Sequence, residues 1–124
     1  MAHKILLAED NKVFLKLLIH DLKSQGFETL GLSTGDEVIE TFQSFKPDLV
    51  VLDGLLPGKN GFDLAREIRS LPDGAKIPII LMTGVYKEIE FYKYSKEIGI
   101  DVHYDKTKFD KNEFVKMVKD LISA

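Results

Sequence analysis

The chain has 124 residues, no cysteine, 44% hydrophobic and 30% charged residues, and a formal net charge of −3 at pH 7. This composition fits one globular domain and excludes disulfides, thiolate metal sites and a cysteine nucleophile, while the lack of a basic stripe disfavours direct nucleic-acid binding. The apolar stretch near the N-terminus is too short for a signal peptide, and no apolar run approaches the ~20 residues of a membrane span, so we expect a cytoplasmic protein without membrane contact.

Short apolar runs alternate with patterns of helical periodicity along the whole chain. The runs predict strands and the periodic segments predict helices, several of which end at a glycine or just before a proline. In chain order the predicted pairs are residues 5–8 with 11–25, 29–32 with 36–45, 49–52 with 62–71, 77–82 with 87–98, and 100–104 with a last helix that Asp110 caps.

This alternation predicts an α/β fold, a doubly wound (βα)5 domain over residues 1–124 with a parallel five-stranded sheet and helices on both faces. Residues 49–52 and 77–82 are apolar at consecutive positions, which is typical of strands buried on both faces. A flavodoxin-like strand order, 2-1-3-4-5, would make the first, third, fourth and fifth strands neighbours. Ligands of such sheets gather at the carboxyl ends of the strands.

Polar side chains come directly after those four predicted strands. They are Glu9 and Asp10, Asp53, Thr83, and Lys106. Three carboxylates that lie close together either take up protons or hold a cation, and oxygen ligands without histidine or cysteine favour a hard ion, Mg²⁺ or Mn²⁺. A carboxylate beside such an ion can attack phosphorus, and the hydroxyl and ammonium groups would share the charge of the transition state. We expect Asp53 to be this nucleophile.

Each residue also has an ordinary structural explanation. Asp10 could cap the first helix, Thr83 could bond to backbone at the end of its strand, and Glu9 and Lys106 could be solvated surface residues. Asp53 is the hardest to explain in this way, because it ends a run of four apolar residues. The joint occurrence of these residues at four strand ends favours a chemical site.

These residues lie in motifs that resemble the receiver domain of two-component response regulators over essentially the whole chain. The motifs are the acidic pair at 9–10, KPDLVVLDGLLPGKNG at 46–61, PIILMTG at 78–84 and GIDVHYDK at 99–106. The resemblance implies a signalling switch that accepts a phosphoryl group on Asp53 from a histidine kinase or a histidine phosphotransfer protein. It does not imply an enzyme, beyond self-catalysed phosphotransfer and slow autodephosphorylation.

The resemblance also implies a set of ligands. Thr83 and Lys106 would bind the phosphoryl oxygens. The magnesium site would consist of Asp10, Asp53, the backbone carbonyl of Leu55 and, through a water molecule, Glu9. The fourth helix, fifth strand and fifth helix would form the face that binds a downstream protein or an attached output domain.

Two departures from the family pattern concern the fifth strand and the peptide bond after Lys106. Most relatives have a cis proline after the lysine, whereas Thr107 occupies that position here, and a cis bond before a non-proline residue costs roughly 3–4 kcal/mol. We therefore expect a trans or a strained peptide bond. The switch aromatic of the family is replaced by His103, which is either the output switch or an exposed histidine without that role.

Other departures lie beside the expected phosphorylation site. Gly54, directly after Asp53, is expected to loosen its loop. Leu55 and Val85 offer no hydrogen bond to a water molecule that would hydrolyse the acyl phosphate, so we expect a long-lived phosphoryl group.

The fourth predicted helix carries aromatic residues that cannot all share one face, so at least one should be exposed. These residues are Tyr86, Phe91, Tyr92 and Tyr94.

Three alternative functions remain open from the sequence. A pseudo-receiver, a protein interaction module that is not phosphorylated, is favoured only by Thr107 and His103. A phosphatase with an aspartate nucleophile would need a second aspartate where Leu55 stands. A flavin-binding domain would need a loop that cradles phosphate after the first strand, where the acidic Glu9 and Asp10 would repel it.

Overall fold

The computed structural model describes residues 2–84 and 89–124. Within these residues the strands are β1 (Lys4–Ala8), β2 (Glu28–Leu32), β3 (Leu49–Asp53), β4 (Ile79–Thr83) and β5 (Val102–Asp105). The helices are α1 (Lys12–Lys23), α2 (Val38–Phe45), α3 (Gly61–Ser70), α4 (Ile89–Ile98) and α5 (Lys111–Ser123), with two 3-10 turns, η1 (Pro72–Gly74) and η2 (Lys106–Lys108). In the part of the chain that is described, no helix is both long and apolar enough to cross a membrane.

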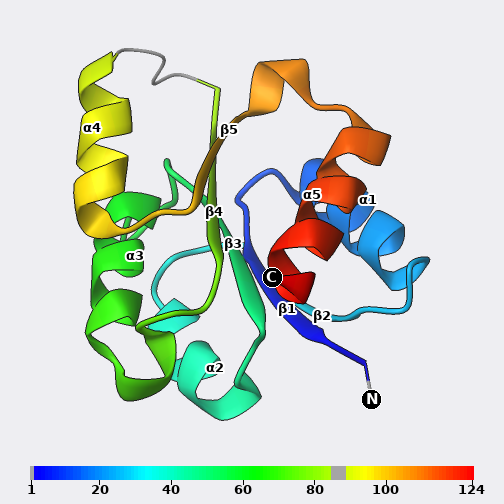
Figure 1. Ribbon diagram of the computed structural model, residues 1–124, viewed down its shortest axis with the longest axis horizontal. Helices are drawn as coiled ribbons and strands as arrows, with labels where there is room; N and C mark the ends of the chain where they lie inside the picture. Colours follow the sequence, from blue (N-terminus) through cyan, green and yellow to red (C-terminus); the bar gives the residue numbers. More distant parts are fainter. Residues whose placement is uncertain (1, 85–88) are drawn as a thin grey trace.

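The sheet is parallel and five-stranded, in the order β2-β1-β3-β4-β5. Helices α1 and α5 cover one face, and α2, α3 and α4 cover the other (Figure 1). The predicted fold class, strand order and two-sided helix cover are therefore confirmed. The order makes β1, β3, β4 and β5 consecutive neighbours, so their carboxyl ends lie along one edge of the sheet.

The central strands β3 and β4 are buried at every residue. Side chains that alternate along these strands belong to two separate apolar clusters, one on each face of the sheet. The cluster under α1 and α5 contains Leu49, Val51, Ile80 and Met82, and the cluster under α2, α3 and α4 contains Val50, Leu52, Ile79 and Leu81. This double burial explains why the two runs are apolar at consecutive positions.

Side-chain caps fix the beginnings of α1 and α5. Asn11 accepts a hydrogen bond from the backbone N–H of Phe14, and Asp110 accepts one from the backbone N–H of Glu113. The predicted cap at Asp110 is confirmed. The suggestion that Asp10 caps the first helix is wrong, because Asn11 is in the cap position and satisfies the free N–H group.

The apolar pattern of α1 extends further around the helix than the core does. Val13 is 80% exposed and Leu17 is 44% exposed, whereas Leu18 and Leu22 are buried. The helical spacing of apolar residues therefore predicts the helix but not its buried face, since Val13 and Leu17 lie on its solvent side.

Tyr94 of α4 packs against α3. Its ring lies 5.6 Å from that of Phe62, the Arg66 guanidinium lies 5.5 Å from its centroid, and Arg66 donates a hydrogen bond to its hydroxyl. Tyr94 is half-buried, so it is not the exposed aromatic that the sequence predicts. Tyr86 lies outside the described residues, as do the side chains of Phe91 and Tyr92.

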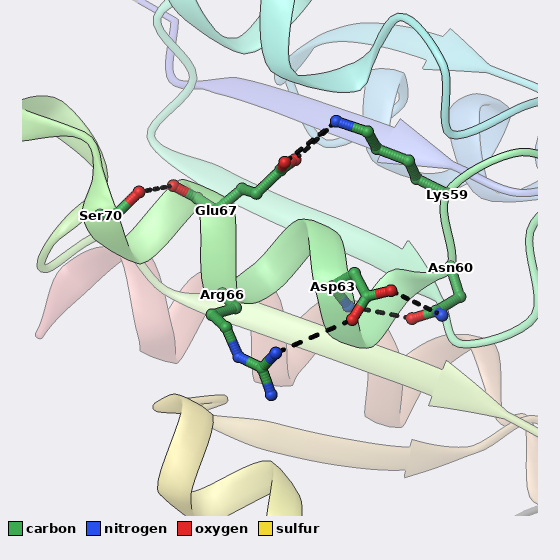
Figure 2. Close-up of polar contacts among 6 residues, drawn as sticks. All are labelled: Lys59, Asn60, Asp63, Arg66, Glu67 and Ser70. Atoms are coloured by element: carbon green, nitrogen blue, oxygen red, sulfur yellow. Dashed lines mark hydrogen bonds and ion pairs between the residues drawn. The ribbon is translucent and has the colours of Figure 1, made fainter.

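The outer face of α3 carries a row of polar contacts (Figure 2). Lys59 pairs with Glu67 at 3.0 Å, Asn60 caps the helix through the N–H of Asp63, and Arg66 lies 4.0 Å from the Asp63 carboxylate. The two ion pairs, Lys59 with Glu67 and Arg66 with Asp63, are solvent-exposed, so each contributes only a few tenths of a kcal/mol to stability.

Arg69, in the last turn of α3, connects three separate segments. Its guanidinium donates two hydrogen bonds to the carbonyl of Gly99, at 3.0 and 2.7 Å, and one each to the carbonyls of Gly74, at 2.9 Å, and Ile77, at 2.7 Å. It also pairs with the Asp101 carboxylate at 2.8 Å, and its side chain is only 16% exposed. Arg69 thus holds the end of α4, the η1 turn and the entry to β4 against α3.

We expect Arg69→Met to lower the free energy of unfolding by roughly 2–4 kcal/mol, because three backbone carbonyls and a carboxylate lose a charged donor in a largely buried place. Urea unfolding followed by circular dichroism measures the loss. Arg66→Met, which removes an exposed arginine of the same helix, is the control and should cost less than about 1 kcal/mol. Equal losses in the two variants would contradict the role given to Arg69.

Candidate functional site

Three carboxylates meet at the carboxyl ends of β1 and β3. One oxygen from each of Glu9, Asp10 and Asp53 lies within 4.8 Å of the others. Glu9 is 3% exposed and Asp53 is 4% exposed, whereas Asp10 is exposed. The grouping results from the sheet, since β1 and β3 are hydrogen-bonded neighbours that end side by side, with Ala8 opposite Leu52. Oxygen ligands at this spacing suit a hard divalent cation.

Lys106 reaches the same group of acids from the other side. Its Nζ lies 2.6 Å from Oε1 of Glu9 and 3.3 Å from Oδ2 of Asp53. Burial alone would lower the pKa of Lys106, but its bond to Glu9 and the charge of Asp53 outweigh this and raise the pKa, so the ammonium stays charged. No cis peptide bond occurs in residues 2–84 or 89–124, so Lys106 is joined to Thr107 by a trans bond.

Thr83 ends β4 next to Asp53 and is 3% exposed. Gly54 lies against it: a Cβ on Gly54 would come within 2.5 Å of the Thr83 methyl carbon. The N–H of Gly54 bonds to the carbonyl of Met82, and its own carbonyl accepts from the N–H of Gly61. The prediction that Gly54 loosens this loop is therefore wrong, because the glycine is fixed on both sides and permits a close approach.

His103 lies in the middle of β5, opposite Leu81 of β4. Its Nε2 is 3.1 Å from the hydroxyl oxygen of Thr83, and the side chain is half-buried. Burial lowers the pKa of His103 and so favours the neutral ring, although the negative charge of Asp105 acts in the opposite direction. The alternative that the His103 side chain is exposed is wrong, because it is half-buried. The role of His103 as a switch stays a prediction.

Leu55 lies beside the phosphorylation site that the sequence predicts. Its backbone N–H donates to Oδ1 of Asp53 at 3.0 Å, and its side chain is 45% exposed. The exposed side chain brings no hydrogen-bonding group to the mouth of the site. The ligand role of the Leu55 carbonyl stays a prediction, and Val85 lies outside the described residues.

The carboxylates strongly affect one another in the metal-free protein. Burial, a hydrogen bond with Asp53 and the charge of Asp53 raise the pKa of Glu9 from 4.5 to about 7. Burial alone would also raise the pKa of Asp10, but hydrogen bonds with Glu9 and Asp53 outweigh it and lower that pKa. The three acids therefore cannot all ionise at low cost, which favours the uptake of a proton or a cation at this place.

Two residues at the beginning of α1, the cap residue Asn11 and Phe14, also touch the site, although the sequence did not assign them to it. The backbone N–H of Asn11 donates to Oε2 of Glu9 at 3.0 Å, and the ring centroid of Phe14 lies 5.3 Å from Nζ of Lys106. Phe14 lies in the helix predicted over residues 11–25, where its sequence context shows only an apolar position. Its contact with Lys106 depends on η2 returning to the beginning of α1, which no local pattern shows.

We expect Glu9→Gln to stabilise the metal-free protein at pH 8 but not at pH 4. Because the folded-state pKa of Glu9 is raised, its ionised form opposes folding. This penalty is absent below pH 4.5 and grows as the pH rises toward 7. Removing it should add roughly 1–3 kcal/mol to the free energy of unfolding at pH 8. Urea unfolding in EDTA at both pH values measures the difference, and a stabilisation that does not depend on pH would contradict the interpretation.

Comparison with known proteins places this arrangement in a family. The sequence matches the response regulator receiver domain family over residues 5–119. It is 38% identical over 90 residues to the phosphate regulon transcriptional regulatory protein PhoB of Rhizobium meliloti (strain 1021), and the match covers 73% of this chain and 40% of PhoB. The chain thus spans less than half of the length of this relative.

Solved structures give the same result. The signal receiver domain of a signal transduction histidine kinase from Syntrophus aciditrophicus superposes with a TM-score of 0.88 at 30% identity, over 98% of this chain and 91% of that one. The chemotaxis response regulator CheY4 of Vibrio cholerae superposes with a TM-score of 0.89 over 98% and 99% of the two chains, where 21% identity shows the fold alone. The chain therefore belongs to the response regulator receiver domain family of two-component systems.

Proposed function

We propose that this receiver domain is a phosphorylatable switch in which Asp53 accepts a phosphoryl group from a histidine kinase or a histidine phosphotransfer protein. The observation that supports the proposal is the buried Asp53 carboxylate, which lies in one cluster with Glu9 and Asp10 and 3.3 Å from the Lys106 ammonium. Accepting a phosphoryl group is the general function of the family, and the acceptor residue and the donor are our assignment.

The transfer would proceed by nucleophilic attack on phosphorus. A carboxylate oxygen of Asp53 forms the new P–O bond while the P–N bond of a phosphohistidine breaks, and the imidazole nitrogen leaves with the electron pair and takes up a proton. A bound Mg²⁺, or Mn²⁺ in its place, would neutralise charge on the transferred group, with Asp10, Asp53, the Leu55 carbonyl and, through water, Glu9 as its ligands.

Thr83 and Lys106 would hold the oxygens of the transferred group. The Lys106 ammonium is already next to Asp53, and Thr83 ends the adjacent strand β4. A positive charge and a hydroxyl donor placed before the reaction stabilise a phosphoryl group without further reorganisation. The domain would catalyse only its own phosphorylation and a slow loss of the phosphoryl group, and it is not proposed to be an enzyme with a separate substrate.

His103 would carry the signal to the face formed by α4, β5 and α5, where a downstream protein or an attached output domain would bind. The Thr83 hydroxyl has a single hydrogen, and a phosphoryl oxygen can only accept. When Thr83 donates that hydrogen to the phosphoryl group, its contact with Nε2 of His103 can persist only if the ring nitrogen donates. The contact would therefore link the state of Thr83 to the tautomer and position of His103 in β5.

The pseudo-receiver alternative rested on Thr107 and His103. Because Lys106 contacts Glu9 and Asp53 although Thr107 comes after it, Thr107 gives no argument against phosphorylation. His103 lies against Thr83, at the place where a coupling residue is needed. Neither departure favours a module that is not phosphorylated.

We expect acetyl phosphate with Mg²⁺ to add one phosphoryl group to the wild-type protein, and intact-mass spectrometry measures the gain. Asp53→Asn should abolish it, because the amide nitrogen is no nucleophile. Asp36→Asn, which changes an exposed acid outside the site, should leave it unchanged. No mass gain in the wild type, or a gain that survives Asp53→Asn or EDTA, would favour the pseudo-receiver.

We expect the phosphoryl group on Asp53 to be long-lived, since the exposed Leu55 side chain cannot orient a water molecule for hydrolysis. Leu55→Asn adds such a group and should shorten the half-life, as measured by the decay of the phosphorylated mass in Mg²⁺ without phosphatase. Leu17→Asn, at a position with similar exposure on α1, is the control. A wild-type half-life of only seconds would refute this expectation.

A further inference from the structure

We propose that Phe14 is a positioning residue for Lys106 and that its ring fixes the ammonium at the phosphorylation site. The inference rests on the proposed function and adds a residue to it. The ring centroid of Phe14 lies 5.3 Å from Nζ of Lys106, within the range in which an aromatic face attracts a cation. The Lys106 side chain is 24% exposed, so the contact is partly shielded from water and is stronger than a contact at the open surface.

The contact between Phe14 and Lys106 completes a closed cycle of four interactions. Lys106 bonds to Oε1 of Glu9, the other oxygen of Glu9 accepts from the N–H of Asn11, and the Asn11 side chain accepts from the N–H of Phe14. The ring of Phe14 then returns to Lys106. The cap that begins α1 therefore also fixes where the aromatic ring lies relative to the acid and the ammonium.

The segment that carries Lys106 is held against the aromatic ring of Phe14. Phe109 packs edge-on against Phe14, with centroids 5.1 Å apart, and its N–H bonds to the carbonyl of Lys106. The Asp105 carboxylate accepts from the N–H and the hydroxyl of Thr107, which closes the turn on the other side of Lys106. The turn thus presents the lysine stem to Phe14 through a trans backbone.

The chemistry of the site explains why a neutral contact is useful. Lys106 bonds to Glu9 and Asp53 in this structure, but it must turn toward the phosphoryl oxygens during the transfer. A third carboxylate would hold the ammonium more strongly and would compete with those oxygens. The face of Phe14 attracts the cation without a net charge, so it keeps Lys106 in place while the anionic partners change.

The test compares phosphorylation by acetyl phosphate in variants at residue 14. Phe14→Leu keeps the apolar side chain and removes the ring, and it should lower the maximal rate about 3- to 30-fold, the range that a cation–π contact is worth. The affinity for Mg²⁺ should not change, because the Phe14 side chain has no polar atom that could bind the ion or its carboxylate ligands. Phe14→Tyr keeps the ring and should restore the rate. Phe45→Leu removes the corresponding contact of Lys4, at 5.4 Å and on an unrelated part of the surface, and should leave the rate unchanged.

A second background separates positioning from a general loss of structure. In Lys106→Met the ring has no cation to hold, so adding Phe14→Leu should cause no further loss of rate. The proposal is overturned if Phe14→Leu phosphorylates as fast as the wild type, or if it slows the reaction equally with and without Lys106.

A measurement on the metal-free protein does not depend on phosphorylation. The ε-methylene protons of Lys106 should show an upfield ring-current shift in the NMR spectrum, which Phe14→Leu removes and Phe14→Tyr keeps. If the wild type takes up no phosphoryl group, the proposed function fails, and this shift alone decides the contact: its presence supports the pairing of Phe14 with Lys106, and its absence overturns it.

Discussion

The repulsion between three carboxylates at one edge of the sheet is the constraint that the rest of the site must offset. Glu9, Asp10 and Asp53 lie at the ends of two neighbouring strands, and two of them are almost fully buried. Such a group is unstable when all three are ionised, so it takes up a proton, an ammonium or a divalent cation. The Lys106 ammonium supplies a positive charge, and the raised pKa of Glu9 favours the uptake of a proton. A bound metal ion would reduce the repulsion in a third way.

The fold provides this constraint by its connectivity. β1 and β3 are neighbours at the point where the strand order changes direction, so the chain leaves them toward opposite faces of the sheet, and in folds of this kind ligands bind at that point. The apolar strands on either side are buried on both faces and cannot yield, so the acids stay together. The energy that holds like charges in one place comes from the hydrophobic core.

The fold and the grouping of the three acids could be predicted from the sequence, because apolar runs and the residues at strand ends are local features. Contacts between distant segments could not be predicted. Gly54 is fixed by its approach to Thr83, a residue of another strand, whereas composition alone suggested a loose loop. Periodicity includes Val13 and Leu17 in a stripe but does not say how far the core extends around the helix. The position of Phe14 near Lys106 depends on the return of η2 to α1.

The bonds of Arg69 to the carbonyl of Gly99 have a mechanical consequence for α4. They attach the carboxyl-terminal end of that helix to α3, which itself packs on the sheet. The contacts of Tyr94 with Phe62 and Arg66 attach the middle of α4 to the same helix, so a displacement of α4 would pivot on its carboxyl-terminal half and grow with distance from it. Motion of this helix would therefore be largest at the end farthest from Arg69.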